Sequence, residues 1–426
     1  MAINLAKEGY PVTGYDVYTP LVDKLVAAGG KPSSTPADAC KEADFVILMV
    51  ANMHQINSVL FEGDNAAVNG IQKGKMIIIC STCPPKFLHE LRKSLDGANR
   101  SDIRLIDCPV SGGTIRAANG TLSIFAAGPK EDITSADEVL NVMSGNLYKV
   151  EGGISSGTKI KTIHQLMAAT NIISTSEAMG LAATVGLNTK KAFEHVKAND
   201  GTSFMFENRG PHMLADDWSP LSALGIIWKD AGIVCDAAQE IRFPAFMAST
   251  AEQLYRRGND EGMLKDDDAK LVQMYLPSDK GSLVAQKSSA DERINASHQV
   301  SADTVNDLLA GIHLAASVEA LAFCKALGMD TKLMYEIISK AAGWCKMFTE
   351  HMPQMLEKNE WTLAHCKDAD AVRERLVCFE LVDCRADIVL IAILQENAVD
   401  KCRQIKYPCP MASMALQQFY FAGLRS

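Results

Sequence analysis

A repeat in the second half of the chain constrains the fold more than any other feature of the sequence. Shifting the chain by 142 residues aligns His164–Leu214 with Asn306–Leu356 without a gap, and 14 of these 51 positions are identical. A shared ending follows, because Phe243-Pro244 and Tyr407-Pro408 each precede a Met-Ala-Ser triplet. Self-similarity over such a length indicates one structural unit used twice. The sequence therefore predicts two tandem copies of a helical domain.

The first 150 residues have a different pattern, in which short β-rich runs alternate with helical stretches. Amphipathic pieces such as Leu21–Ala28 and Lys86–Leu95 separate the runs. This alternation predicts a parallel α/β sheet, and runs that are apolar throughout are typical of strands covered on both faces. The candidate strands are Pro11–Tyr15, Phe45–Val50, Met76–Cys80, Leu105–Asp107 and Leu122–Ala127.

From about Ile160 the pattern changes to long helical stretches. Thr162–Val185 is rich in Ala, Leu and Met and is long enough to form a helix that joins two domains. Residues 259–300 are polar and charged, with Lys265–Tyr275 as one further candidate helix. The predicted organisation is an α/β domain over 1–153, a helical copy over 154–276, a linker over 277–300 and a second helical copy over 301–426.

Charge and composition exclude several classes of protein. The chain has 42 Lys and Arg against 51 Asp and Glu, and a net charge of −9 without a dense basic block is unfavourable for nucleic acid or anionic membranes. No uninterrupted apolar run approaches the roughly 18 residues that span a bilayer, and the first residues lack a signal-peptide core. The 12 cysteines are scattered. We therefore expect a cytoplasmic protein with reduced cysteines and no nucleic-acid or membrane partner.

Polar and small residues follow the candidate strands. Asp16 follows the first, and an acidic residue there accepts hydrogen bonds from ribose hydroxyls and repels a 2′-phosphate, which favours NAD over NADP. An Asp after a strand is also an ordinary turn residue. Val50-Ala51-Asn52 end the next run, and Thr82 follows the third. No metal site is predicted, because Cys80 and Cys83 have no second pair to complete a zinc site.

Three further groups suit the chemistry of an organic acid. Ser111-Gly112-Gly113 offers a hydroxyl and unhindered backbone N–H groups, which suit a carboxylate but are equally typical of an ordinary turn. Lys161 and His164 are three residues apart and share a helix face. A partly buried lysine can act as acid or base, whereas a lysine in a first helical turn is more often solvated. Lys229 stands beside an apolar run, where helix amphipathicity would also explain it.

Taken in order, these segments resemble the β-hydroxyacid dehydrogenase family, which includes hydroxyisobutyrate, threonate and phosphogluconate dehydrogenases. Asp107–Gly113 (DCPVSGG) resembles the substrate-binding stretch of that family, and Gly157–Leu166 (GTKIKTIHQL) resembles its catalytic segment. Lys229-Asp230 matches its second pocket lysine. The resemblance covers residues 1 to about 276, and the helical part recurs in 301–426.

The resemblance implies an oxidoreductase with a Rossmann-like NAD-binding domain, an all-α domain and an active site between them. Ser111, Gly112 and Gly113 would hold the carboxylate of a small β-hydroxy acid. Lys161 would take the proton of the hydroxyl as hydride passes to the nicotinamide. His164, where the family usually has Asn, would orient substrate hydroxyls as in threonate dehydrogenase-like members, which favours a four-carbon sugar acid. The implied cofactor contacts are Asp16, Val50, Ala51, Asn52, Thr82 and Lys229, with Lys229 also near the substrate.

The start of the chain departs from the family pattern. Members begin with a strand and a G-x-G-x-M-G turn that approaches the cofactor pyrophosphate, whereas Met1–Ala6 resembles the helix after that turn. We expect a sheet without its first strand and a severely reduced dinucleotide affinity. The alternative to an active NAD-dependent dehydrogenase is therefore an inactive or truncated homologue with impaired cofactor binding.

The second helical copy has lost one of the residues that the resemblance assigns to catalysis. At the 142-residue offset, Lys161 aligns with Asp303, and residues 362–384 contain no clear equivalent of Lys229. We therefore expect copy two to have a degenerate site and to pack on copy one. Such intrachain pairing would replace part of a homo-oligomer interface.

Overall fold

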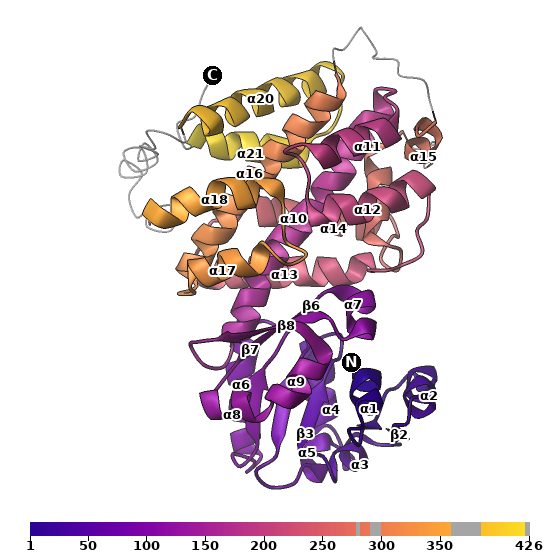
Figure 1. The fold of residues 1–426 in the computed structure, drawn as a ribbon, viewed down its shortest axis with the longest axis vertical. Helices are drawn as coiled ribbons and strands as arrows, with labels where there is room; N and C mark the ends of the chain where they lie inside the picture. The colour runs from indigo at the N-terminus through magenta and orange to yellow at the C-terminus, as the bar shows by residue number, and fades with distance from the viewer. Residues whose placement is uncertain (278–281, 290–299, 359–384, 422–426) are drawn as a thin grey trace. The chain divides into compact units, whose positions relative to one another are not determined.

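The structure, a computed structural model, describes residues 1–277, 282–289, 300–358 and 385–421 (Figure 1). It divides into two compact units, Met1–Lys161 and Thr162–Ser426. The first unit contains the strands, and the second is helical. Helix α10 (Ser156–Thr184) begins in the first unit and continues into the second. The two predicted helical copies thus belong to one compact unit, and each unit is described separately below.

The α/β unit contains two sheets. A parallel pair is formed by β1 (Thr13–Gly14) and β2 (Lys31–Pro32). The larger sheet has the order β3-β4-β5-β7-β6, with β8 paired to β7. Among the described residues β1 and β3 each have a strand partner on one side only. The strands of the larger sheet are β3 (Phe45–Leu48), β4 (Met76–Ile79), β5 (Arg104–Asp107), β6 (Val110–Ser111), β7 (Leu122–Ala127) and β8 (Ser144–Val150).

The larger sheet is mixed, so the prediction of a wholly parallel sheet is wrong. β3, β4 and β5 run parallel, and β8 is parallel to β7. β7, however, is antiparallel to both β5 and β6. Only residues 112–121 separate β6 from β7. This is less than the dozen or so residues that a parallel crossover needs, so the chain returns through the sheet in the opposite direction.

Helices cover both faces of the larger sheet. Ile77 and Ile79 of β4 belong to one apolar cluster with residues of α4, α5 and α6. Met76 and Ile78 alternate onto the other face, where they pack with Leu5 of α1 and with residues of α8 and α9. The helices of this unit are α1 (Ala2–Lys7), α2 (Thr19–Ala27), α3 (Pro36–Cys40), α4 (Met53–Phe61), α5 (Ala67–Gly70), α6 (Pro85–Gly97), α7 (Gly113–Asn119), α8 (Lys130–Ser135) and α9 (Asp137–Met143).

The helical unit is built around two long buried helices, α10 and α16 (Ala302–Ala326). By length and composition α16 could cross a membrane, but 89% of its most apolar window is buried inside the structure. Polar residues interrupt that window, which is why no uninterrupted run is visible in the sequence. The other helices are α11 (Thr189–Ala198), α12 (Phe204–Ala215), α13 (Leu224–Glu240), α14 (Phe246–Asp260), η1 (Asp268–Tyr275, a 3₁₀ helix), α15 (Leu283–Lys287), α17 (Thr331–Ile338), α18 (Lys346–Lys358), α20 (Arg385–Gln404) and α21 (Pro410–Phe421).

The predicted linker over 277–300 is partly structured. Helix α15 lies within it, and its residues Leu283 and Val284 are buried. The Thr189 hydroxyl donates a 2.6 Å hydrogen bond to the carbonyl of Val284. Two buried apolar side chains and one backbone hydrogen bond therefore hold this short helix against the helical unit. The residues around it in the sequence are polar, which is why the sequence predicts a linker. Most of the rest of 277–300, and all of 362–384, lies outside the described residues.

Each of the helices α10–α14 in the first predicted copy begins or ends at a residue that corresponds to one in the second predicted copy. The starts of α11 and α17, and of α12 and α18, are 142 residues apart, as are the ends of α10 and α16. The ends of α13 and α20, and the starts of α14 and α21, are 164 residues apart. Figure 1 shows the α16–α21 segment, in orange and yellow, among the magenta helices α10–α14. Of these corresponding pairs, α14 and α21 pack against each other within the helical unit.

Contacts between the two copies are reciprocal. Phe204 N–H donates to the carbonyl of Trp344, and Lys346 N–H donates to the carbonyl of Thr202. Positions 344 and 346 correspond to 202 and 204 at the 142-residue offset, so each copy makes the same bond to the other. This exchange of equivalent bonds is the pattern of an isologous two-fold interface, here within one chain.

Two buried glutamates also form equivalent hydrogen bonds, each with backbone N–H groups of the other predicted copy. Glu177 of α10 accepts the N–H groups of Met411 and Ala412, which begin α21, both at 3.0 Å. Glu319 of α16 accepts the equivalent N–H groups at the start of α14, at 2.9 and 3.0 Å. Each carboxyl therefore satisfies the first-turn donors of a helix from the other copy. Burial raises the pKa of Glu177 to about 8 and that of Glu319 to about 7.

We predict that the stability of this pairing falls as the pH rises. Both carboxyls bind protons more tightly in the folded protein than at the ordinary value of 4.5, so unfolding free energy should decline from about pH 4.5 to about 8. Glu177→Gln places an NH₂ group against a backbone donor, which should cost about 1–3 kcal/mol at neutral pH and make the decline shallower. Urea unfolding across this pH range tests both effects.

Glu319→Gln should have the same effects as Glu177→Gln. The control is Glu261→Gln, which removes a more exposed carboxyl that pairs with Arg257. Glu261→Gln should change the unfolding free energy by less than about 0.5 kcal/mol. An unchanged pH dependence in both Glu177→Gln and Glu319→Gln would show that these carboxyls do not titrate in this range.

Candidate active site

The predicted cofactor residues lie where β1, β3 and β4 end. Asp16 is exposed after β1, and its Oδ1 accepts the N–H of Tyr18 at 2.7 Å. Asn52 is the N-cap of α4, where its side chain accepts the N–H of Gln55. The hydroxyl of Ser81 accepts the N–H of Val50 at 2.8 Å and so ties the end of β3 to the end of β4. Ala51 follows Val50, and Thr82 follows Ser81, half-buried.

The sequence prediction gave no role to Ser81, although a buried hydroxyl at the end of a parallel strand is a recognisable signal. Its bond to Val50 gives the two strand ends a fixed relation. Ligands of open α/β sheets bind at the carboxyl ends of strands. The Val50–Ser81 bond therefore stabilises the edge of the sheet where the predicted cofactor residues lie.

The Ser111–Gly113 segment forms the transition from β6 to α7. Ser111 is buried, with 5% of its surface exposed. Gly112 is the N-cap of α7 and has a φ of +137°, a conformation that side chains disfavour. A Cβ at this position would also lie 2.7 Å from Cδ of Arg116. The backbone here thus requires glycine, which agrees with both a carboxylate cradle and a tight turn.

Asp107 connects this segment to the start of α10. Its two carboxylate oxygens accept the backbone N–H and the hydroxyl of Thr158, each at 2.7 Å. Burial raises the pKa of Asp107 to about 7, and the two bonds from Thr158 oppose that rise. A Cβ on Gly157 would lie 2.2 Å from the carbonyl oxygen of Phe125, so α10 begins in close contact with the sheet. Lys161, one turn beyond Thr158, has 6% of its surface exposed.

His164 lies on the same helix and is fully engaged within the helical unit. Gly343 N–H donates to its Nε2 at 3.0 Å, which leaves the ring proton on Nδ1. Nδ1 lies 3.0 Å from Oε1 of Gln165. In the second copy Asn306, the equivalent of His164, accepts the N–H of Gly201 at 2.9 Å. A hydrogen bond from His164 to a substrate would therefore require one of these partners to be released.

The same hydrogen-bonded chain reaches Lys229. Gln165 donates from Nε2 to Oδ2 of Asp230. The other oxygen of Asp230 lies 3.0 Å from Nζ of Lys229. The second predicted helical copy is thus connected, through three side chains, to the lysine that the sequence predicts in the pocket. We call this chain of contacts from Gly343 through His164, Gln165 and Asp230 to Lys229 the relay. Its continuity depends on a contact 179 residues distant in sequence, which local motifs do not reveal.

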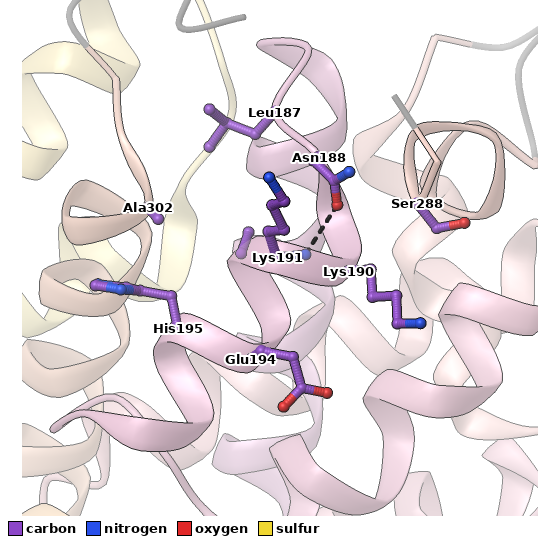
Figure 2. A pocket seen from close by; sticks show the side chains of 9 residues that line it. Leu187, Asn188, Lys190, Lys191, Glu194, His195, Ser288 and Ala302 are labelled. Atoms are coloured by element: carbon purple, nitrogen blue, oxygen red, sulfur yellow. Dashed lines mark hydrogen bonds between the residues drawn. The ribbon is translucent and has the colours of Figure 1, made fainter. Parts of the chain in front are cut away.

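A separate cavity of about 640 Å³ lies at the start of α11 (Figure 2). Figure 2 shows Lys190 and Lys191 pointing away from each other, with the Asn188 side chain bonded to the N–H of Lys191. No residue of the predicted active site lines this cavity. Among the described residues, no group of three His, Cys, Asp or Glu side chains is placed to hold a metal ion.

Comparison with known sequences decides the family. The profile of the NAD binding domain of 6-phosphogluconate dehydrogenase matches residues 1–152. A second profile, described as the NAD-binding domain of NADP-dependent 3-hydroxyisobutyrate dehydrogenase, matches two segments, 155–275 and 301–376. An L-threonate dehydrogenase of Cupriavidus necator is 34% identical over 275 residues, which are 65% of this chain and 91% of that protein. The chain belongs to the β-hydroxyacid dehydrogenase family.

Solved structures agree with this assignment. A 3-hydroxyisobutyrate dehydrogenase from Salmonella typhimurium is 30% identical, covers 64% of this chain and 94% of its own, and superposes with a TM-score of 0.59. The 6-phosphogluconate dehydrogenase of Plasmodium falciparum is 13% identical, with a TM-score of 0.66 over 100% of this chain and 90% of its own. The latter likeness concerns the fold alone. The chain therefore has a Rossmann-like domain followed by a helical C-terminal part.

We predict that interrupting the relay destabilises the helical unit of this β-hydroxyacid dehydrogenase family member. Gln165→Leu would remove one hydrogen-bond partner from the buried Asp230 carboxylate and one from the His164 ring. Asp230 would keep Lys229, and His164 would keep the N–H of Gly343. The expected loss is about 1–3 kcal/mol of unfolding free energy, measured by urea unfolding. Gln253→Leu, at an exposed position where the amide bonds only to its neighbour Glu252, is the control and should cost much less. Equal losses would argue against the relay.

Proposed function

We propose that the chain is an NAD-dependent dehydrogenase of a four-carbon sugar acid resembling threonate, with Lys161 as general acid and base. The observation that carries the proposal is the Asp107–Thr158 connection in the α/β unit. It joins the strand that leads to Ser111 with the helix that carries the buried Lys161. The names of the relatives support the substrate class, since the protein from Cupriavidus necator is an L-threonate dehydrogenase.

In this proposal the chain's own residues bind the acid and move one proton. The Ser111 hydroxyl and the N–H groups of Gly112 and Gly113 donate to the substrate carboxylate. Nζ of Lys161 accepts the proton of the hydroxyl that is oxidised and returns it in the reverse reaction. A buried lysine gives up its charge more readily than an exposed one, which suits this role. The nicotinamide cofactor, when bound, supplies the hydride acceptor.

His164 and Lys229 take secondary roles in the proposal. Lys229, half-buried beside Asp230, adds a positive charge near the acid and the cofactor. His164 would orient the substrate hydroxyls only by exchanging one of its present partners. With Gly343 and Gln165 in place, its role is to hold the relay.

The residues fit the nucleoside part of NAD. Asp16, Asn52 and Thr82 follow three strands of the α/β unit. The exposed Asp16 carboxylate accepts the N–H of Tyr18, and its negative charge would repel a 2′-phosphate. We therefore favour NAD, although relatives that use NADP have the same fold. Val50 and Ala51 would line the cofactor beside Asn52. No G-x-G sequence occurs in the 426 residues, so none of them forms the glycine-rich turn that usually donates to the pyrophosphate.

We further infer that the helical domain is duplicated and that copy two takes the place of a partner subunit. Three observations support this: one profile matches two segments, corresponding helices share one bound each, and equivalent residues exchange bonds across the pairing. The role of copy two is then to complete the helical unit. Its own site is degenerate, since Asp303, which replaces Lys161, is 77% exposed and pairs with His195.

The competing proposal is a homologue with impaired cofactor binding and no dehydrogenase activity. The lack of a G-x-G sequence favours it, because the phosphates would lose their main backbone donors. Retention of Lys161, the Ser111–Gly113 cradle and Lys229 favours an active enzyme. The two proposals differ in a direct measurement, which is the binding of NADH.

We predict that Lys161→Met lowers kcat for L-threonate oxidation with NAD by about 100- to 10,000-fold, because the proton acceptor is gone. Lys159→Met, two residues earlier on α10 and half-buried, is the matched control and should retain most of the activity. Initial rates of NADH formation provide the measurement. Full activity of Lys161→Met would exclude the proposed acid/base role.

We predict that Asp16→Ala shifts the cofactor preference toward NADP by about tenfold, which corresponds to about 1.4 kcal/mol. Competition of the two reduced cofactors for the parent chain, followed by nucleotide fluorescence, measures the preference. Asp23→Ala, at an exposed position on α2, is the control. If the parent chain binds neither NADH nor NADPH, the inactive-homologue proposal is favoured. Binding of NADH without turnover of any four-carbon acid would contradict only the substrate class.

A further inference from the structure

The two predicted copies share the first step of the relay. Gly343 N–H donates to Nε2 of His164 at 3.0 Å, and Gly201 N–H donates to Oδ1 of Asn306 at 2.9 Å. Asn306 stands 142 positions after His164, and Gly343 stands 142 positions after Gly201. Each copy therefore gives one glycine N–H to the same position of the other copy. A hydrogen-bond acceptor at this position serves the pairing in both directions.

Beyond this step the two copies differ. In the first copy Gln165 continues the relay to Asp230 and Lys229. The residue 142 positions after Gln165 is Asp307, whose Oδ1 accepts from Nδ2 of Asn306 at 3.4 Å. An ionised carboxylate accepts hydrogen bonds but donates none, whereas the Gln165 amide does both. Only the first copy therefore has a residue here that can connect the shared step to a second carboxylate.

The charged end of the relay also occurs once. At the 164-residue offset that aligns the ends of α13 and α20, Ile393 and Leu394 stand where the first copy has Lys229 and Asp230. The second copy therefore pairs with the first without an ammonium and a carboxylate at these two positions. Packing of the two copies explains the shared first step of the relay, but it does not explain the charged end.

The hydrogen bonds of the relay allow one arrangement of donors and acceptors. A backbone N–H can only donate, so Nε2 of His164 accepts from Gly343 and Nδ1 carries the ring proton. Nδ1 therefore donates to Oε1 of Gln165, and this turns the amide so that its Nε2 donates to Oδ2 of Asp230. The other carboxylate oxygen lies 3.0 Å from Nζ of Lys229. One N–H group of the second copy thus determines how each later side chain is oriented.

The side chains between the two ends of the relay are buried. His164 retains 1% exposure, Asp230 5% and Gln165 7%. The Lys229 side chain, at the far end, retains 27%. Buried partners cannot exchange their bonds for bonds to bulk water, so a displacement at one contact is passed to the next. At the other end, a Cβ on Gly343 would lie 3.3 Å from Cδ2 of His164, closer than an ordinary contact.

We propose that Gly343, Gln165 and Asp230 are positioning residues, through which the second copy holds the Lys229 ammonium in place. The inference rests on the proposed function, in which that ammonium lies near the acid and the cofactor. Attraction between an ammonium and a carboxylate falls with their separation, so affinity for the acid depends on where Lys229 is held. The second copy then has a part in substrate binding in addition to completing the helical unit.

Competitive acetylation of the full chain measures how firmly Lys229 is held. The folded protein is labelled with a trace of acetic anhydride and then completely with the deuterated reagent in denaturant. Fragment spectra of chymotryptic peptides give the isotope ratio at each lysine. Lys270 is the internal reference, because it pairs with Asp266 at 2.7 Å, its side chain is 25% exposed and it has no part in the relay. In Asp230→Asn, labelling of Lys229 relative to Lys270 should rise about two- to fivefold, since the ammonium has lost its carboxylate.

Two variants of His164 test whether the effect travels along the relay. His164→Leu removes the acceptor of the Gly343 N–H and the donor to Gln165, so labelling of Lys229 should rise about twofold or more. His164→Asn keeps one acceptor and one donor, as Asn306 does in the second copy, and labelling should stay within about 1.5-fold of the parent. An equal rise in both variants would contradict the inference.

Gly343→Ala tests the contribution of the second copy with a single methyl group. The added Cβ presses on the His164 ring, so labelling of Lys229 should rise in the same direction as in His164→Leu. Asn306→Leu is the matched control, because it removes the equivalent acceptor on the other side of the pairing and has no part in the relay. Equal rises in Asn306→Leu and His164→Leu would show a general loosening of the pairing. Unchanged labelling in both Gly343→Ala and His164→Leu would overturn the inference.

Kinetics separate this inference from the proposed function. Asp230→Asn should raise KM for L-threonate about three- to tenfold and change kcat by less than about twofold, because a displaced Lys229 weakens binding of the acid and of its transition state alike. A merely structural role would lower the active fraction, and hence kcat, without changing KM. A parent chain that does not oxidise L-threonate contradicts the proposed function, and the labelling then decides the inference by itself. Raised labelling with an unchanged KM in an active enzyme contradicts the role of the relay in binding the acid.

Discussion

The helical unit depends on a constraint that applies to any buried helix end. The first turn of a helix has N–H groups without partners inside the helix, and burying them unpaired costs free energy. Here Glu177 and Glu319 supply the acceptors, each to a helix of the other copy. Neither α14 nor α21 could begin where it does without a carboxyl from the opposite copy. Each of the two predicted copies therefore supplies a buried acceptor for helix N–H groups of the other.

This mutual dependence extends to the residues assigned to chemistry. Gly343 of copy two holds the ring of His164, and the relay continues through Gln165 and Asp230 to Lys229. His164, to which the family resemblance assigns a role at the substrate, is thereby also part of the packing between the predicted copies. The same position in copy two, Asn306, accepts the equivalent glycine N–H. The pairing alone accounts for a hydrogen-bond acceptor at this position in both copies.

Much of the fold could be predicted, because the strongest signals are local. The apolar runs at Phe45–Val50 and Met76–Cys80 contain β3 and β4, and the repeat predicts paired helices, which correspond at one end each. Strand direction is not encoded in a run's composition, so the antiparallel course of β7 was missed. β2 and β6 have two residues each, too few for any pattern, and β8 is largely polar. Helix α15 is stabilised by tertiary contacts, which the polar sequence around it does not predict.

The candidate site shows the same limit. Ser111–Gly113, Lys161 and Lys229 are found by motif, whereas Asp107, Thr158 and Gln165 were assigned no role, because their importance lies in what they contact. One signal was available: the repeat pairs Gly201 with Gly343 and Glu177 with Glu319 as identities, although the lysine at 161 becomes Asp303. These four residues make contacts between the two predicted copies, and the residue proposed for proton transfer occurs once. The two predicted copies thus share residues such as Glu177 and Glu319, whereas Lys161, which we propose for proton transfer, occurs in the first alone.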